Sequence, residues 1–301
     1  MKLSAVLKRA KQLSRPYRIT DGSRFRLKDH DPADTGPHDA DDKTAAAESL
    51  AEGIEALSTL QDMLYAQDRW STLFLFQAMD AAGKDSAIKH VMSGVNPQGC
   101  QVASFKTPSS EELDHDFLWR CERELPERGR IGIFNRSYYE EVLVVRVHPE
   151  YLAAQRLPAE PSGKELWQAR FKQIRNFEKH LTLNGTRVVK FFLHVSRGEQ
   201  KRRFLARIDE PEKNWKFSAT DVAEREHWKE YMGAYEELIR ETATPEAPWY
   251  VVPADHKWFT RMVVAAAAVD CLGSLDLAYP AVSAKKRQDL LAAKRVLLAE
   301  K

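Results

Sequence analysis

The sequence has few cysteines, no long hydrophobic run and almost no excess of charge of either sign. Its three cysteines, Cys100, Cys121 and Cys271, are odd in number and form no C-x-x-C pair, so neither a disulfide framework nor a zinc site is expected. The apolar run at 262–269 is too short to span a bilayer, and the first ten residues lack the apolar core of a signal peptide. These absences predict a reduced, cytoplasmic, globular protein that has no membrane partner.

The charge balance is also informative, because 46 Lys and Arg residues face 44 Asp and Glu residues. A net charge of +2 argues against a protein that binds nucleic acid by bulk electrostatics. The charges are nevertheless segregated, since residues 1–28 carry nine bases and one acid, and residues 29–62 carry ten acids and one base. The simplest interpretation is a solvated basic and acidic arm over residues 1–43. The alternative is an arm that grips a polyanion or a neighbouring subunit.

Strand and helix patterns alternate from residue 44 onward. Short apolar runs predict five strands, at 71–79, 100–105, 131–135, 186–195 and 248–253. Helical spacing predicts helices at 44–67, 86–94, 109–125, from Ser137, and at 162–185, 197–208, 222–242 and 256–277. This alternation predicts an α/β fold, in which helices cover both faces of a parallel sheet and ligands bind at the carboxyl ends of the strands. We expect one domain at 44–280 with a basic lid at about 197–224, and a basic tail at 281–301.

The segment 76–85 has the layout of a phosphate-binding loop (P-loop, or Walker A motif), in which a strand enters a small-residue turn, Gly-Lys and a helix. In such loops, backbone N–H groups and the helix N-terminus bind an anion and the lysine neutralises it. The candidate phosphate-binding residues are Ala81, Ala82, Gly83, Lys84 and Asp85. The pattern is imperfect, because Ala78 replaces its first glycine and Asp85 its Ser or Thr. A plain strand-to-helix turn that needs Gly83 for its geometry is the alternative.

Asp80 is an unusual residue for such a loop, because a carboxylate there would repel the phosphate. A metal cation between the two removes the repulsion, and Mg²⁺ is commonly held by one or two carboxylates together with substrate phosphates. Asp80 is therefore the candidate metal ligand, or an acceptor that orients an attacking group. A solvated aspartate in a turn is the alternative.

A second polar cluster, Asn135 to Glu141, follows the third predicted strand. Asn135 is suited to bind a metal-bound water, and the guanidinium of Arg136 is suited to grip a phosphate with two hydrogen bonds. The adjacent acids Glu140 and Glu141 are candidates for accepting hydrogen bonds from a nucleotide or for holding a cation. Alternatively, Arg136 simply pairs with one of these acids at the surface.

The third cluster is the basic segment expected to form the lid. Arg203 and Arg207 are one helical turn apart, which places two guanidinium groups on one stripe and suits a row of phosphates. Lys213 and Lys216 continue the series, with Trp215 beside them. The alternative is a solvated helix face that nearby acids neutralise.

Taken together, several long segments closely resemble family 2 polyphosphate kinases. They include QAMDAAGKD (77–85), IFNRSYYEEVLVVRVH (133–148), EQKRRFLARIDEPEKNWKF (199–217) and APWYVVPADHKW (247–258). The resemblance covers about residues 45–280 in the correct order. It implies a P-loop kinase-like, three-layer α/β/α fold with a helical lid. Two positions depart from the common pattern: Ser86 replaces a glycine, and Tyr138 replaces a histidine.

The resemblance also implies an activity, namely transfer of phosphate between inorganic polyphosphate and nucleotides, dependent on Mg²⁺ or Mn²⁺. By that resemblance, the catalytic residues are Asp80, Lys84, Asn135 and Arg136. In the same resemblance the basic lid positions match Arg203, Arg207 and Lys216. Because polyphosphate carries a charge on each phosphate, its site needs an extended basic track, which Lys106 and Lys213 would continue. The form FNRS-x-YE looks like the branch that acts on both AMP and ADP, with guanine nucleotides as further substrates, and points to Glu140 and Glu141 for nucleotide specificity. A homo-oligomer, either a dimer or a tetramer, is expected.

Two other functions fit parts of the sequence. An ATP-dependent nucleoside or nucleotide kinase would use the same loop, but it would need only a compact triphosphate site and not a long basic lid. A non-catalytic regulator that binds polyphosphate or nucleotides would be favoured if Asp80 or Lys84 were missing, and both are present.

Overall fold

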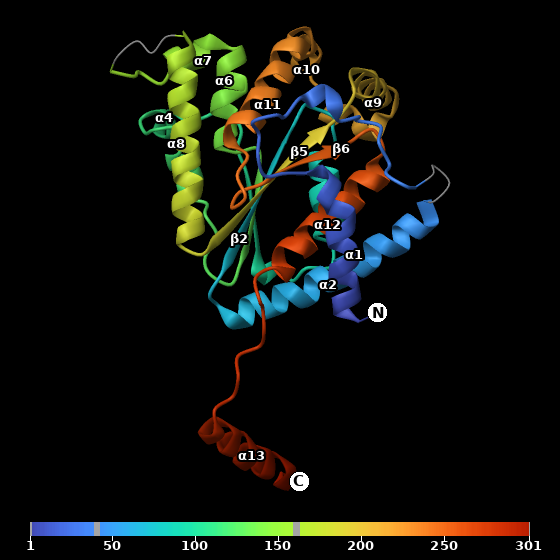
Figure 1. The fold of residues 1–301 in the computed structure, drawn as a ribbon, viewed down its shortest axis with the longest axis vertical. Helices are drawn as coiled ribbons and strands as arrows, with labels where there is room; N and C mark the ends of the chain where they lie inside the picture. Colours follow the sequence, from blue (N-terminus) through green and yellow to red (C-terminus); the bar gives the residue numbers. More distant parts are fainter. Residues whose placement is uncertain (1, 39–42, 159–162, 301) are drawn as a thin grey trace.

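The computed structural model describes residues 2–38, 43–158 and 163–300 and shows an α/β fold around one sheet (Figure 1). The strands are β1 (Arg18–Ile19), β2 (Ser71–Ala78), β3 (Cys100–Ser104), β4 (Ile131–Asn135), β5 (Thr186–His194) and β6 (Trp249–Pro253). Their order across the sheet is β1-β6-β5-β2-β4-β3. All neighbours are parallel except β1, which pairs antiparallel with β6. The predicted α/β fold with a mainly parallel sheet is confirmed.

Helices lie on both faces of this sheet. The α-helices are α1 (Leu3–Ser14), α2 (Lys43–Gln67), α3 (Lys84–Val91), α4 (Ser110–Leu113), α5 (Trp119–Glu122), α6 (Val144–Val147), α7 (Pro149–Ala153), α8 (Gly163–Leu183), α9 (Arg197–Asp209), α10 (Ala219–Ala223), α11 (Trp228–Thr242), α12 (Lys257–Gly273) and α13 (Ala284–Ala299). The 3₁₀-helices are η1 (Arg15–Tyr17), η2 (Leu27–Asp29), η3 (Pro97–Gly99), η4 (Tyr138–Val142), η5 (Pro211–Lys216) and η6 (Glu224–His227). Helix α12 packs against α1, α2 and α3, whereas α8 packs against β5 and α11 (Figure 1).

The core explains why the central strands are continuous apolar runs. Strand β2 lies between β4 and β5, and all its residues except the last are buried. A strand covered by helices on both faces has no polar face, so its side chains do not alternate. Phe76 of β2 stacks on Phe191 of β5 with ring centroids 4.8 Å apart. This rigid centre fixes the carboxyl ends of the strands, where the candidate residues lie.

The N-terminal stretch differs from the prediction of a solvated arm. Val6 and Ala10 of α1 are buried, as is Tyr17, and Arg18–Ile19 adds a sixth strand to the five predicted. The apolar residues of α1 recur at helical spacing between its lysines and arginines, so one face packs on α12 while the charged face stays in water. The high local charge hid this pattern, and a two-residue strand is too short for sequence periodicity to detect.

Three predicted helices are shorter or broken. The helix expected at 109–125 is two short helices, α4 and α5, separated where Asp116 accepts a hydrogen bond from the backbone N–H of Leu118. Asp favours such local turns over helix. The helix expected from Ser137 is the 3₁₀-helix η4 followed by α6, and the helix expected at 222–242 begins as η6.

The C-terminal helix α13 stands apart from the body at the end of an extended segment (Figure 1). None of its residues is buried. Within the described ranges, no helix combines the length and apolar character needed to cross a membrane.

Candidate active site

The loop between β2 and α3 has the backbone shape of an anion-binding loop. Gly83 has a φ of 108°, a conformation that favours glycine, and Ala81 has a φ of 61° although it carries a side chain. A non-glycine residue in the left-handed region is strained, and such strain is common at functional sites. The turn aims the start of α3 at the carboxyl edge of the sheet, and Lys84 is the first residue of that helix.

Lys84 is buried directly beneath this loop, with 9% of its surface exposed. Its Nζ donates to the carbonyl oxygen of Ala78 at 2.9 Å, its one hydrogen bond among the described residues. Burial lowers the pKa of the Lys84 ammonium, and the carboxylate of Asp80 opposes that shift. Because an ammonium has three N–H donors, Lys84 keeps donors for an anion bound in the loop.

Arg136 joins the phosphate loop to the end of β4. Its guanidinium lies 3.4 Å from the Asp80 carboxylate and 4.0 Å from that of Glu140. Burial acts to lower the pKa of Arg136, but Glu140 and Asp80 outweigh burial and the pKa is raised. Arg136 also has a positive φ, of 65°. The structure thus brings Asp80, Arg136 and Glu140 together, as the sequence predicted for residues at neighbouring strand ends.

Asn135, the last residue of β4, faces the first turn of α3. Its side-chain amide donates to the Asp85 carboxylate at 2.6 Å. This contact ties the second candidate cluster to the phosphate loop. In this structure the Asn135 amide group therefore bonds a carboxylate of the loop, where the sequence suggested a contact with metal-bound water.

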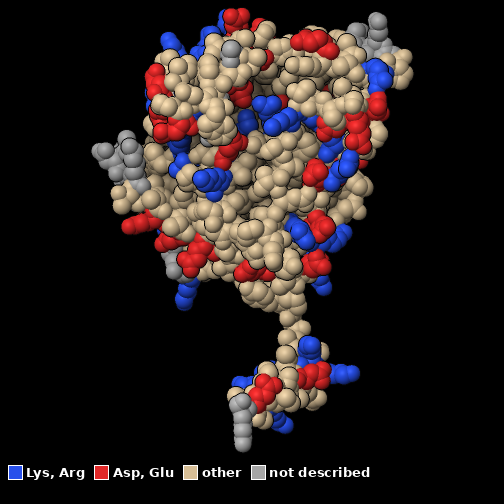
Figure 2. Space-filling view, turned by 180° about the vertical axis from the view of Figure 1, so that it is seen from behind, with Lys and Arg blue, Asp and Glu red and all other residues tan. Residues whose placement is uncertain are grey.

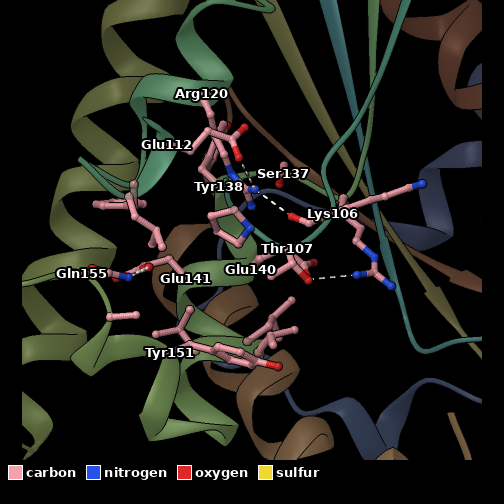
Figure 3. Close-up of a pocket in the computed structure, with 18 of the residues that line it drawn as sticks. Lys106, Thr107, Glu112, Arg120, Ser137, Tyr138, Glu140, Glu141, Tyr151 and Gln155 are labelled. Atoms are coloured by element: carbon pink, nitrogen blue, oxygen red, sulfur yellow. Dashed lines mark hydrogen bonds and ion pairs between the residues drawn. The ribbon is translucent and has the colours of Figure 1, made fainter. Parts of the chain in front are cut away.

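A cavity of about 440 Å³ opens beside Asp80 and Arg136. Its walls combine apolar and aromatic side chains with many charged and polar ones, as suits a ligand that has both a ring and charged groups. Figure 3 shows its lining, which includes Lys106, Tyr138, Glu140 and Tyr151. The space-filling view shows a hollow in the upper part of the molecule with Lys and Arg side chains inside it (Figure 2).

The adjacent acids Glu140 and Glu141 point in different directions (Figure 3). Glu140 accepts a hydrogen bond from Gln77 at 2.7 Å and approaches Arg136. Glu141 is buried, and it pairs with Arg170 at 2.8 Å and accepts from Gln155 at 2.6 Å. Burial raises the pKa of Glu141, although Arg170 opposes the shift. Only Glu140 of the two therefore faces the Asp80–Arg136 group.

Comparison with known proteins assigns the chain and its fold to a family. The model of the family described as polyphosphate kinase 2 matches residues 40–278, most of the chain. The chain belongs to the polyphosphate kinase 2 family.

Two relatives and one solved structure match over most of their length. An ADP-polyphosphate phosphotransferase of Rhodopseudomonas palustris is 57% identical, over 83% of this chain and 87% of the relative. An AMP/ADP-polyphosphate phosphotransferase of Meiothermus ruber is 45% identical, over 88% of this chain and 94% of the relative. The crystal structure of polyphosphate kinase 2 from Arthrobacter aurescens TC1 superposes with a TM-score of 0.84 at 38% identity, covering 93% of this chain and 96% of that one. The resemblance seen in the sequence is confirmed.

In this polyphosphate kinase 2 family member, the basic residues expected on the lid have unequal surroundings. Arg203 is buried, and its guanidinium donates to the carbonyls of Ala81 and Ala82 at 3.1 and 2.7 Å and to those of Ala254 and Asp255 at 2.6 and 3.1 Å. Arg203 therefore holds α9 against the phosphate loop.

The remaining basic residues lie nearer the solvent. Arg207 lies 3.7 Å from Asp221, and its guanidinium stacks over Phe204. Lys213 pairs with Glu210, and the side chain of Lys216 lies outside the described residues. Lys106 is exposed at the cavity, and its carbonyl accepts a hydrogen bond from Arg120 at 2.8 Å.

Sequence reasoning missed several residues of the candidate site in this polyphosphate kinase 2 family member. Gln77 holds Glu140, and Gln200 of α9 donates to the Asp80 carbonyl at 2.9 Å. Tyr231 and Tyr235 of α11 line the cavity. Gln77 directly follows the apolar run 73–76 and precedes the loop, a signal that could have identified it. Gln200 and the tyrosines lie on helices far along the chain, and only the folded structure brings them here.

Proposed function

We propose that the protein transfers the terminal phosphate of inorganic polyphosphate to the terminal phosphate of a nucleotide, converting AMP to ADP and ADP to ATP, reversibly. The observation that supports this most directly is the contact between Asp80 and Arg136 at 3.4 Å. It places the phosphate loop and the cavity side by side, so one substrate in each would meet at these two residues.

The cavity is the proposed nucleotide site. Its volume of about 440 Å³ suits a nucleotide, and its aromatic and apolar walls suit a base. Glu140 faces Arg136 from this side, and is therefore the proposed specificity residue of the pair Glu140 and Glu141. The names of the two relatives, one acting on ADP and one on AMP and ADP, support both nucleotides as acceptors.

The phosphate loop and the basic residues beside it are the proposed polyphosphate site. Lys84 and the loop would hold the end of the chain, and Lys106, Arg207, Lys213 and Lys216 would neutralise phosphates further along it. A polymer with a charge on every phosphate needs such an extended series of cations. Arg203 would act indirectly, because its donors already hold four backbone carbonyls.

The chemistry requires positioning and charge neutralisation more than proton transfer. An oxygen of the nucleotide's terminal phosphate attacks the terminal phosphorus of polyphosphate, and a new P–O bond forms. The bond from that phosphorus to the bridging oxygen breaks, and the shortened chain leaves with the bonding electrons. Lys84 and Arg136 would neutralise the charge on the transferred group, which is where electrostatic stabilisation lowers the barrier. No general base is needed, because the attacking phosphate is ionised at neutral pH.

The residues at the loop also fit Mg²⁺, with Mn²⁺ as a substitute. Within the described ranges no group of three His, Cys, Asp or Glu side chains is arranged to hold a metal. A single carboxylate beside substrate phosphates nevertheless suits Mg²⁺, which prefers oxygen ligands and keeps several waters. Asp80 is about one third exposed beside the loop and would hold the ion. Bound there, the ion would neutralise charge on the phosphates.

The direct test of the proposed function is an acceptor assay. AMP, ADP, GMP and GDP are incubated separately with long-chain polyphosphate and Mg²⁺, and the nucleotides formed are separated by chromatography. We expect ADP from AMP and ATP from ADP. Activity with ATP as the phosphate donor and none with polyphosphate would instead identify an ATP-dependent kinase.

The metal assignment has its own test. Asp80→Asn keeps the size of the side chain and removes its charge, so the Mg²⁺ concentration needed for half-maximal rate should rise by about tenfold. Asp116→Asn, at another carboxylate that lines the same cavity, is the matched control and should leave that concentration unchanged. An unchanged Mg²⁺ dependence in Asp80→Asn would exclude Asp80 as the ligand.

A further inference from the structure

The C-terminal helix α13 exposes more large apolar side chains than any solvated helix needs. Leu290, Leu291, Leu297 and Leu298 are 51% to 76% exposed, and no residue of the helix is buried. Contiguous exposed apolar surface usually marks an interaction site. We propose that α13 docks on helix α2 of a second copy of this chain, so that two copies exchange their C-terminal helices.

The leucines of α13 lie on one face, with two cations between them. Residues seven apart occupy nearly the same angular position on a helix, two turns along. Leu290 and Leu297 form one such pair, and Leu291 and Leu298 form a second pair about 100° away. Arg287 and Lys294 fall between these two rows with the same spacing. The docking face of α13 is therefore a leucine surface with two cations about 10 Å apart along its centre.

Helix α2 offers a complementary face. Glu48, Glu55 and Asp62 are exposed and also recur every seven residues, so they form an acidic stripe along the solvent side of α2. None of these carboxylates forms an ion pair within the part of the chain that the structure describes. The stripe repeats every two turns, as the cations of α13 do, so Arg287 and Lys294 can each face one acid. Tyr65, 53% exposed at the end of α2, adds apolar surface beside the stripe.

The path of the chain favours exchange with a second copy over folding back. The last part of the body is fixed beside the end of α2, where Gln67 Nε2 donates to the carbonyl of Asp276 at 3.4 Å. From there the segment runs away from the body, and α13 lies at its far end (Figure 1). Figure 2 shows the charged residues of α13 equally separate from the body. A reciprocal exchange pairs α13 of each copy with α2 of the other and gives a closed two-fold dimer.

The test uses analytical ultracentrifugation of the full chain with charge-reversal variants. We expect a dimer or larger assembly for the wild type. Arg287→Glu combined with Lys294→Glu reverses both central cations and should weaken association by at least about a hundredfold. Lys285→Glu combined with Arg295→Glu makes the same change in net charge away from this face and should leave association unchanged.

Rescue across the interface makes the test specific to α2. Glu55→Lys combined with Asp62→Lys should dissociate the assembly as strongly as the reversal on α13. The variant with both reversals should associate again, because the charges are exchanged and remain complementary. Turnover should not change in these variants beyond the effect of assembly, because neither helix face contributes to the cavity.

Several outcomes would overturn the proposal. A monomeric wild type, an assembly that survives the Arg287→Glu and Lys294→Glu reversal, or a failure of the combined reversal to restore association would each do so. If a variant misfolds, a chain ending at residue 283 replaces it, and an undiminished assembly of that chain contradicts the proposal. Wild type that stays monomeric but binds vesicles of phosphatidylcholine and phosphatidylglycerol would show that α13 docks on an anionic membrane. These measurements do not depend on the proposed phosphotransfer activity.

Discussion

Two buried lysines, Lys84 in the phosphate loop and Lys190 in the core, show how the same group takes different roles. Burial lowers the pKa of both, and a nearby carboxylate opposes the shift in each. Lys190 is fully buried, and its ammonium donates to Glu178 at 2.7 Å, the Thr242 carbonyl at 2.8 Å and the Tyr139 hydroxyl at 3.1 Å. Those three bonds use all its donors, whereas Lys84 uses one. The satisfied lysine is structural, and the unsatisfied one is available to a ligand.

The Lys190 cluster also supports the site. Both Tyr138 and Tyr139 donate to the same oxygen of Glu178, at 3.0 and 2.8 Å. These tyrosines begin η4, which also carries Glu140 and is separated from Arg136 only by Ser137. The buried ion pair therefore anchors the segment that presents Arg136 and Glu140 to the phosphate loop.

The largest effect predicted from this comparison is on stability. Lys190→Met leaves Glu178 buried without its cation, so the free energy of unfolding should fall by about 3–5 kcal/mol. Adding Glu178→Leu removes the uncompensated charge and should recover part of that loss. Urea unfolding of the two variants measures both values. A single variant as stable as the wild type would show that the pair contributes nothing to the fold.

Lys84 should show the opposite behaviour, with a loss of turnover and not of stability. In Lys84→Ala the cation is absent from the transferred phosphate, so kcat should fall roughly a hundredfold to a thousandfold. The melting temperature should stay close to that of the wild type, because the charge removed is unsatisfied in the folded protein. Near-normal kcat in the folded variant would show that this loop is not catalytic.

A third buried basic group, His194 at the end of β5, extends the comparison to a side chain for which burial favours the neutral form. Burial lowers its pKa from 6.5 to about 4, against the opposing effect of Asp255, and its Nδ1 lacks a hydrogen-bond partner among the described residues. The nearby His30 also lowers this pKa, and Asp31 raises it.

The pH dependence follows from the sign of that shift. The pKa of His194 is lower in the folded state than in the unfolded state. Its contribution to the free energy of unfolding is therefore fully present above pH 6.5 and is lost as the pH falls toward about 4. The shift corresponds to about 3 kcal/mol. His194→Gln should therefore flatten the loss of unfolding free energy between these pH values, while His180→Gln on the exposed face of α8 should not. Parallel curves for wild type and His194→Gln would argue against the shift.

The smallest effect is expected at helix α9, in the segment predicted to form a lid. Arg207→Gln should lower kcat/KM for long polyphosphate a few-fold more than for a short oligophosphate, because a partly exposed cation contributes little and only to phosphates beyond the one transferred. Arg202→Gln, on the same helix and largely exposed beside Glu199, is the control. The ratio of kcat/KM for the two donors is the measurement. An unchanged ratio in Arg207→Gln would remove Arg207 from the proposed polyphosphate site.

The sequence predicted those parts of the molecule that depend on local pattern. Most of the parallel strands are short apolar runs, and the phosphate loop joins one of them to a helix through Gly83 and Lys84. The order of these patterns along the chain was therefore enough to predict the fold class and the position of the loop. The meeting of Asp80 with Arg136 also followed, because parallel strands end at the same edge of a sheet.

What the sequence did not predict depends on contacts between distant segments. Arg203 was indistinguishable from Arg207 on the helix, and only the folded chain shows that its donors are used by carbonyls more than 100 residues earlier. Glu141 was indistinguishable from Glu140 until Arg170 of α8 was placed beside it. The strand β1 has no pattern of its own, since it exists only because β6 offers an edge.

The pairing of β1 with β6 has a consequence for biosynthesis. Arg18 pairs with Tyr250, and α1 packs on α12, so an early segment of this sequence binds segments that are synthesised more than 200 residues later. At a translation rate of about 5–20 residues per second, α1 waits roughly 10 to 50 s for its partners. During that interval the apolar face of α1, including Val6 and Ala10, lacks the α12 surface on which it packs in the folded protein. The N-terminal helix is therefore a segment that chaperones would bind in the nascent chain, and its docking would be a late step in folding.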